Sequence, residues 1–304
     1  MQQRFLALLL LSFILIGKGF CVEPIDRNVL LRRNNPIVQS FDSLTTLSVG
    51  NGEFVMSVDP TGLQTFPERY APNNALVTQA KWGDRHLGII GFEFPSTTFI
   101  EDFDGIDQML ILNSGIVKTS YRLLTNPISV YTVCHPKRNL VAAHIKSELP
   151  IPIKLSFPYT RDNSSSLQWN ANQKHRTKLI SKRSNSVVFG RFIDGLNYYI
   201  VFQWQGNVSI VEKTDNYYVV TPEKGHFAFS CEFLPRFSTT FDEIVLPTFK
   251  ETAEESATAW GTYWSGDCIK TLADSTHLFT PEEELQLLLD CYNSTISGNK
   301  EPSK

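Results

Sequence analysis

The stretch LSVGNGEFVMSVDPTGLQTF, residues 47–66, predicts two strands joined by a tight turn and followed by a second turn. The run Phe54–Val58 shows the period of two that a strand requires. Gly50-Asn51-Gly52 can adopt positive φ and allows another backbone or a ligand to approach closely. Asp59-Pro60-Thr61-Gly62 has turn chemistry at each position. The stretch therefore predicts a β-hairpin in an antiparallel sheet.

Polar side chains lie among aromatic ones in and around this hairpin, which favours a carbohydrate-contacting surface. Sugars present CH faces to aromatic rings, and their hydroxyls bond to amides and carboxylates. The candidate residues are Asn51, Gln64, Phe66, Gln79 and Trp82. The alternative is an ordinary hairpin with core and rim residues, in which Trp82 is buried as most tryptophans are.

The segment NPIVQSFDSLTTLSVGNGEFVMSVDPTGLQTFPERY, residues 35–70, resembles the start of secreted proteins of the six-hairpin glycosidase superfamily, near glycoside hydrolase family 65. Three later stretches resemble proteins of the same superfamily, in the same order along the chain: TQAKWG (78–83), SVYTVCHPKRNLVAAHIKS (129–147) with KLSFPY (154–159), and AWGTYWSG (259–266). The resemblance implies a mainly β fold, an antiparallel β-supersandwich of the galactose-mutarotase-like kind, followed by one or two linker helices. In that superfamily an (α/α)6 barrel carries the catalytic carboxylates, so no catalytic residue is assigned here.

The resemblance implies the N-terminal domain of a glycoside hydrolase that acts on polysaccharide or oligosaccharide and is not catalytic on its own. Its implied partners are carbohydrate and a helical barrel domain missing from this chain. The alternative is a stand-alone carbohydrate-binding or interaction module without catalysis. Glycoside hydrolysis needs two carboxylates roughly 5 to 10 Å apart. Glu53 and Glu68 are interpreted as surface carboxylates, and the sugar, its linkage and the oligomeric state stay open.

The charge pattern argues against a nucleic-acid partner. The 304 residues carry a net charge of −3, and no basic stripe or arginine-rich arm is present. The basic residues between Lys174 and Arg183 are interpreted as a solvated loop. The acidic run from Glu101 to Asp107 is interpreted as a solvated turn, because its spacing departs from an EF-hand. Neither CxxC pairs nor HExxH occur, so no metal and no cofactor are predicted.

The N-terminus has the pattern of a secretory signal peptide. Arg4 precedes an apolar run over residues 5–16, and a cleavage site follows, so residues 1–21 are predicted to be removed. The mature protein is expected to be secreted and extracellular, with no membrane segment. Glycosylation sequons begin at Asn163, Asn207 and Asn293. Four cysteines remain, which allow three pairings: Cys134, Cys231, Cys268 and Cys291.

Short β-branched and aromatic runs recur from residue 116 to about residue 237, which is typical of an antiparallel sandwich. The predicted sandwich domain covers residues 22–247, and residues 248–304 are predicted to be a helical linker and a disordered tail. One helix is predicted from the spacing of Ala253, Ala257, Trp260 and Trp264. A second begins at Thr280-Pro281 with a capping box to Glu283. The apolar face of the second helix (Leu285, Leu288, Leu289 and Tyr292) has no evident partner, so this helix is expected to be poorly packed.

Overall fold

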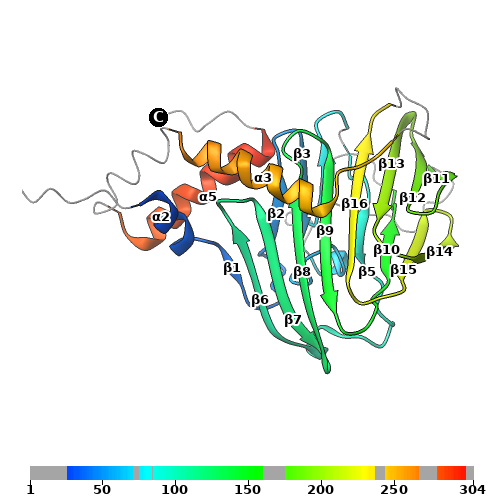
Figure 1. The fold of residues 1–304 in the computed structure, drawn as a ribbon, viewed down its shortest axis with the longest axis horizontal. Coiled ribbons are helices and arrows are strands. Elements are labelled where there is room, and N and C mark those ends of the chain that lie inside the picture. Colours follow the sequence, from blue (N-terminus) through cyan, green and yellow to red (C-terminus); the bar gives the residue numbers. More distant parts are fainter. Residues whose placement is uncertain are drawn as a thin grey trace, which may run out of the picture.

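The computed structural model describes residues 26–70, 75–83, 85–159, 175–236, 244–266 and 279–298. Within these ranges, antiparallel sheets form a sandwich, and helices cover one of its ends (Figure 1). The fold class predicted from the sequence, a mainly β sandwich followed by helices, is confirmed. The proposed signal peptide, Asn163 and Cys268 lie outside the described residues.

The largest sheet has nine strands, all paired antiparallel with their neighbours. In spatial order they are β1 (Ile37–Val38), β6 (Phe103–Ile111), β7 (Ile116–Leu123), β8 (Asn126–Cys134), β9 (Leu140–Ser147), β16 (Phe227–Leu234), β13 (Leu196–Trp204), β12 (Ser186–Ile193) and β11 (His175–Lys182). Consecutive strands from β6 to β9 are neighbours because short turns join them. The crossover from β9 to β16 brings the second half of the chain into the same sheet.

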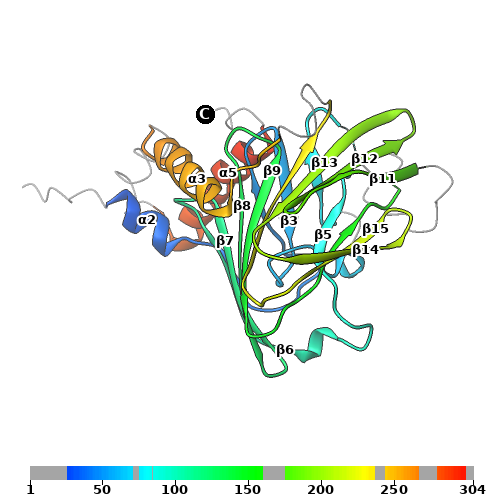
Figure 2. The ribbon, with the colours of Figure 1, turned by 45° about the vertical axis from the view of Figure 1, so that its right-hand side comes forward.

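Two smaller sheets face the large one from the opposite side of the core (Figure 2). The four-stranded sheet contains β14 (Val208–Thr214), β15 (Tyr217–Pro222), β10 (Ile153–Ser156) and β5 (Ile89–Phe92). The three-stranded sheet contains β2 (Leu47–Gly50), β3 (Phe54–Val58) and β4 (Thr78–Ala80). Short 3-10 helices lie at Pro67–Arg69 and Ile100–Asp102.

The core between the sheets is built from the alternating apolar residues of the predicted strands. In β3, Phe54, Met56 and Val58 are buried, as the period of two predicts. The ring of Phe54 stacks on that of Phe233 in β16 at 5.7 Å, which joins the small sheet to the large one. Burying one such side chain contributes about 1.5–3 kcal/mol.

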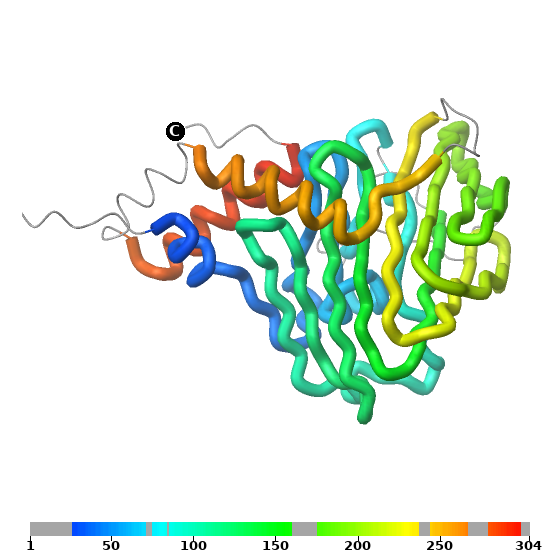
Figure 3. The backbone as a smooth tube through the Cα atoms, in the orientation of Figure 1, coloured from blue at the N-terminus to red at the C-terminus, as the bar shows by residue number. Residues whose placement is uncertain are grey.

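The helices α2 (Arg27–Arg33), α3 (Phe249–Trp264) and α5 (Pro281–Ser297) gather at one end of the sandwich (Figure 3). The Thr280 side chain accepts a hydrogen bond from the backbone N–H of Glu283, whose carboxylate accepts one from Thr280 N–H, so the predicted capping box of α5 is present. No helix in the described part of the chain is both long and apolar enough to traverse a bilayer.

The expectation that α5 is poorly packed is wrong. Its residues Leu288, Tyr292 and Ile296 are buried, and the Tyr292 ring stacks on that of Trp260 in α3 at 4.6 Å. The Tyr292 hydroxyl donates to the carbonyl oxygen of Ser48 at 2.9 Å. The apolar face of α5 therefore packs within the same chain, against Trp260 of α3 and the backbone of β2.

One of the three disulfide pairings is incompatible with the fold. Cys134 and Cys231 are buried free thiols that both lie opposite Val141, one on each side of β9. Two strand spacings separate their Cα atoms by about 10 Å, whereas a disulfide needs less than about 7 Å. Burial in the core raises the pKa of both thiols well above the usual range.

Candidate functional site

The turn between β2 and β3 is held by the side chain of Asn51. Its Oδ1 accepts hydrogen bonds from the backbone N–H groups of Glu53 (2.9 Å) and Phe54 (2.8 Å). Its Nδ2 donates to the carbonyl oxygens of His135 (2.8 Å) and Arg138 (2.9 Å). Because an asparagine amide has two donors and two acceptor lone pairs, all its bonds are used within the protein. Asn51 therefore positions the turn.

The glycines beside Asn51 receive the C-terminal end of α5. The Gly52 N–H donates to the carbonyl oxygen of Ile296 at 3.0 Å, with Gly52 at φ +87°. A Cβ at Gly50 would lie 2.9 Å from Ile296 Cβ. The close backbone approach that these glycines were expected to allow is therefore made by a helix of the same chain.

The second predicted turn forms a buried cage around Asp59. Its carboxylate accepts hydrogen bonds from the backbone N–H groups of Thr61, Thr65 and Phe66 at 2.7–2.8 Å. Burial raises the pKa of Asp59, and these hydrogen bonds oppose that rise. The Gly62 N–H closes the turn on the Asp59 carbonyl at 2.9 Å. The cage fixes the path of the chain into residues 63–66.

Gln64 and Phe66 follow the cage and face the interior. Gln64 is fully buried; its Nε2 donates to Val77 O at 2.9 Å and its Oε1 accepts from Thr78 Oγ1 at 3.0 Å. Phe66 is half-buried, with its ring edge-on to that of Phe41 at 5.5 Å. Gln64 connects the two small sheets, because its Oε1 also accepts from the Ile90 N–H in β5 at 3.2 Å. Phe66 instead packs on Phe103 of the large sheet at 5.7 Å.

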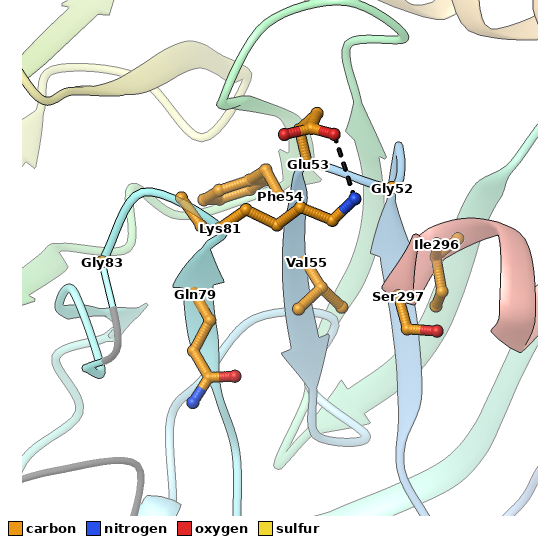
Figure 4. Close-up of a pocket in the computed structure, with 10 residues that line it drawn as sticks. Gly52, Glu53, Phe54, Val55, Gln79, Lys81, Gly83, Ile296 and Ser297 are labelled. Atoms are coloured by element: carbon orange, nitrogen blue, oxygen red, sulfur yellow. Dashed lines mark hydrogen bonds and ion pairs between the residues drawn. The ribbon is translucent and has the colours of Figure 1, made fainter. Parts of the chain in front are cut away.

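An open pocket of about 310 Å³ lies beside the Gly50-Asn51-Gly52 turn (Figure 4). It is lined by Gly52, Glu53, Phe54, Val55, Gln79, Ala80, Lys81, Gly83, Ile296 and Ser297. Val55 and Gln79 are direct cross-strand partners in β3 and β4. The Lys81 ammonium lies 3.0 Å from the Glu53 carboxylate, and in Figure 4 the Gln79 amide extends away from this pair.

The pocket contains one of the five predicted carbohydrate-contacting residues, Gln79. Trp82 follows Lys81 in the chain, but its half-buried ring packs on Tyr198 at 5.6 Å. Its Nε1 is buried and has no hydrogen-bond partner in the described part of the chain. Asn51, Gln64 and Phe66 do not line the pocket. Of the five residues, Gln79 therefore lines the pocket, and the other four make their contacts outside it.

The five residues predicted from the sequence include neither the charged pair nor the α5 residues that line the pocket. Lys81 lies within the family-like TQAKWG stretch, two residues after Gln79, and this closeness in sequence could have indicated that it lies near the same site. Ile296 and Ser297 could not be found in this way, because they reach the pocket only through the packing of α5. Among the described residues, no group of three or more His, Cys, Asp or Glu side chains is arranged to hold a metal ion.

The comparisons with known proteins support a fold and no closer relationship. No protein-family model and no curated protein matches the sequence. A bacterial glucoamylase solved in complex with acarbose matches with a TM-score of 0.50 and 11% identity, over 75% of this chain and 38% of that chain. The chain shares the β-sandwich fold of this enzyme. The predicted resemblance to the sandwich region of six-hairpin glycosidase-like proteins is thus confirmed at the level of the fold.

Two further solved structures have lower scores. A protein described as a kojibiose phosphorylase from the human microbiome has a TM-score of 0.49 and 9% identity, with 86% of this chain and 41% of that chain covered. A family GH92 α-mannosidase from Bacteroides thetaiotaomicron has a TM-score of 0.43 and 8% identity, with 88% and 41% covered. The chain therefore spans about two fifths of the length of the structures it matches.

Proposed function

We propose that this chain is the β-sandwich part of a secreted protein that acts on glycosidic bonds, and that this part is not catalytic by itself. The observation that carries the proposal is the fold shared with the bacterial glucoamylase, of which the chain spans 38%. In the superfamily that the sequence resembles, the catalytic carboxylates belong to a helical barrel. The sandwich would then contribute carbohydrate contacts and support for that barrel.

The acidic groups of the pocket support a non-catalytic role. Glu53 is the one carboxylate among the described lining residues, and it is paired with Lys81 at 3.0 Å. Glycoside hydrolysis uses two carboxylates facing each other across the scissile bond. A single exposed carboxylate in an ion pair is better suited to accepting hydrogen bonds from sugar hydroxyls.

The pocket has the size and polarity for one part of a saccharide. Its volume of about 310 Å³ lies at the lower end of ligand-binding pockets. The Gln79 amide offers a donor and an acceptor, the Glu53–Lys81 pair offers a second such combination, and Val55 supplies an apolar surface. Adjacent sugar hydroxyls require donors and acceptors arranged in this way.

Calorimetric titration with a panel of neutral oligosaccharides tests this proposal. We expect Gln79→Ala and Lys81→Met to weaken binding by about tenfold each, the effect of losing roughly 1.4 kcal/mol. The matched control is Gln205→Ala, because Gln205 is exposed in the turn after β13. Equal affinities in all variants would remove the pocket from the proposal, whereas glycosidase turnover abolished by Glu53→Gln would contradict the non-catalytic role.

A stand-alone carbohydrate-binding module without catalysis is the second candidate, and the packing of α5 favours it. The apolar face of this helix is already buried against α3 and β2 of the same chain, so it does not need a barrel domain to cover it. Sequencing the transcript beyond Lys304 discriminates between the candidates. A following helical domain supports the glycosidase, and a stop codon with retained saccharide binding supports the module.

Secretion and glycosylation belong to the same proposal. Asn207 and Asn293 are both exposed, the first in a turn and the second on α5, so both sequons are accessible in the fold. Expression through a eukaryotic secretory pathway should give a glycosidase-sensitive mass shift that Asn207→Gln reduces. An unmodified protein recovered inside the cells would contradict secretion.

A further inference from the structure

The end strand β11 of the large sheet carries cationic side chains without carboxylate partners. Arg176, Lys178 and Lys182 are exposed, and none of the ion pairs among the described residues involves them. The expectation that this basic segment is a loop is wrong for residues 175–182, which pair with β12. A strand holds side chains of one face at a repeat of about 7 Å, so Arg176 and Lys178 have a fixed spacing. Lys182 follows a register shift between Leu179 and Ser181 and does not continue this repeat.

Two exposed apolar side chains share this outer face with the cations. The register places Arg176 opposite Phe192 and Lys178 opposite Gly190. Phe192 is 37% exposed and Ile180 is 38% exposed, and both lie against the position where a Cβ of Gly190 would be. The Ile180 side chain therefore fills the space that a Cβ of Gly190 would occupy, beside the Phe192 ring. We call Arg176, Lys178, Ile180, Gly190 and Phe192 the β11–β12 patch.

The patch is positively charged within a chain of net negative charge. No Asp or Glu occurs between Asp162 and Asp194, whereas the whole chain has a net charge of −3. Asp194 is itself held by Arg85 at 2.7 Å and by the Tyr159 hydroxyl at 2.7 Å. Clustered charge of one sign attracts ligands of the opposite sign.

We infer that the β11–β12 patch binds an acidic polysaccharide, one that carries uronic-acid carboxylates or sulfate groups. Phe192 and Ile180 would contact the CH faces of a sugar ring, and Arg176 and Lys178 would bind anionic groups along the chain. Arginine suits carboxylate and sulfate because its guanidinium can donate two parallel hydrogen bonds. The inference rests on the proposed carbohydrate function but uses a surface separate from the pocket.

The competing explanation for the same residues is protection of a sheet edge. Lysines on an end strand prevent pairing with other chains and need no ligand. That explanation accounts for the charges of β11, but it does not account for an exposed phenylalanine and isoleucine side by side. It predicts no carbohydrate affinity at this face.

Affinity electrophoresis and calorimetry of the whole chain with polygalacturonate test the inference. We expect binding that weakens as NaCl rises from about 0.01 M to about 0.15 M, because exposed charges are screened. The double variant Arg176→Glu/Lys178→Glu should lose at least about tenfold in affinity, and Phe192→Ala should also weaken binding. The matched control is Lys250→Glu on α3, whose side chain is 83% exposed.

Three outcomes overturn the inference: no binding of polygalacturonate, equal loss in the Lys250→Glu control, or equal affinity for single-stranded DNA of similar length. The first result supports edge protection, and the last shows unspecific attraction between charges. Neutral oligosaccharide binding that depends on Gln79 would survive any of these results, so the pocket and the patch fail separately. Circular dichroism of each variant verifies folding.

Discussion

The two ends of the sandwich treat buried charge in opposite ways. At the helix-covered end, the buried Glu284 carboxylate receives both Arg33 (2.6 Å) and the amide of Asn34 (3.3 Å). At the β11 end, Arg191 is 1% exposed, but its hydrogen bonds go to neutral groups, among them His175 Nδ1 at 2.6 Å. No ion pair among the described residues involves Arg191.

This difference leads us to expect different local stabilities at the two ends. A buried charge without an opposite charge costs free energy, as does a buried donor without an acceptor. Arg191 Nε, His175 Nε2 and Asn216 Nδ2 are all buried and have no hydrogen-bond partner among the described residues. The β11 end is therefore expected to open at a lower free energy than the helix end, as ligand-binding regions often do.

Truncating Trp260 should break the helix end and have the largest effect. Its ring contacts both Trp264 (5.7 Å) and Tyr292 (4.6 Å), so Trp260→Ala removes the surface on which α5 packs. We expect a loss of about 3–5 kcal/mol in unfolding free energy, measured by urea denaturation. Hydrogen exchange should show lost protection at Leu288.

Trp82→Ala is the comparison for this variant, because it removes the same side chain from a half-buried position. A smaller loss is expected there. If both variants lose the same free energy, the helix end has no special role in stability.

Acidification should weaken the β11 end more than the helix end. Burial, assisted by the charge of Arg191, lowers the pKa of His175 from 6.5 to about 4. Burial also lowers the pKa of His135 at the helix end, but the carboxylate of Glu255, 3.2 Å away, opposes this shift. By NMR titration, His175 should therefore protonate at lower pH than His135.

The sign of the stability change follows from these shifts. Because the folded-state pKa of His175 lies below the unfolded value, the unfolded chain binds more protons between pH 6.5 and about 4. The stabilising contribution is complete above about pH 6.5 and is lost as the pH falls through about 4, amounting to up to about 3 kcal/mol. His175→Asn should flatten this part of the curve, and the exposed His226→Asn should not. An unchanged slope in His175→Asn would refute the assignment.

Adding a methyl group at Gly50 should loosen the contact between α5 and the turn. A Cβ there would lie 2.7 Å from Phe54 O and 2.9 Å from Ile296 Cβ. Gly50→Ala is expected to cost about 1–3 kcal/mol by overpacking. Gly261→Ala in α3 is the control, because nothing lies within 4 Å of its Cβ position, and it should stabilise by about 0.4–1 kcal/mol. Equal effects of the two variants in thermal unfolding would contradict the docking of α5 on Gly50.

Lys81→Met should have the smallest effect on stability. The Glu53–Lys81 pair is exposed, and such pairs contribute less than about 1 kcal/mol. A larger loss in urea denaturation would mean that Lys81 supports the C-terminal end of α5 and does not mainly line the pocket.

Local sequence patterns predict most of the sheet-forming segments, the turns of the first hairpin and the start of α5. Alternation in Phe54–Val58, the turn at Asp59–Gly62 and the capping boxes of α3 and α5 depend on interactions between near neighbours. Such interactions are encoded locally, and so most strands, the helices α3 and α5 and the fold class could be predicted. The helix α2 and the strand β11 were not predicted.

The role of each side chain in these elements depends on tertiary contacts. Asn51, Gln64 and Gln79 are all polar residues near one hairpin, yet the side chains of the first two make internal hydrogen bonds, and Gln79 lines the pocket. The packing of α5 on β2 depends on contacts between residues more than a hundred positions apart. The hydrogen bonds of Arg191 depend on contacts across sheets. Local sequence patterns do not contain these contacts, because they form only when the sheets and helices pack together.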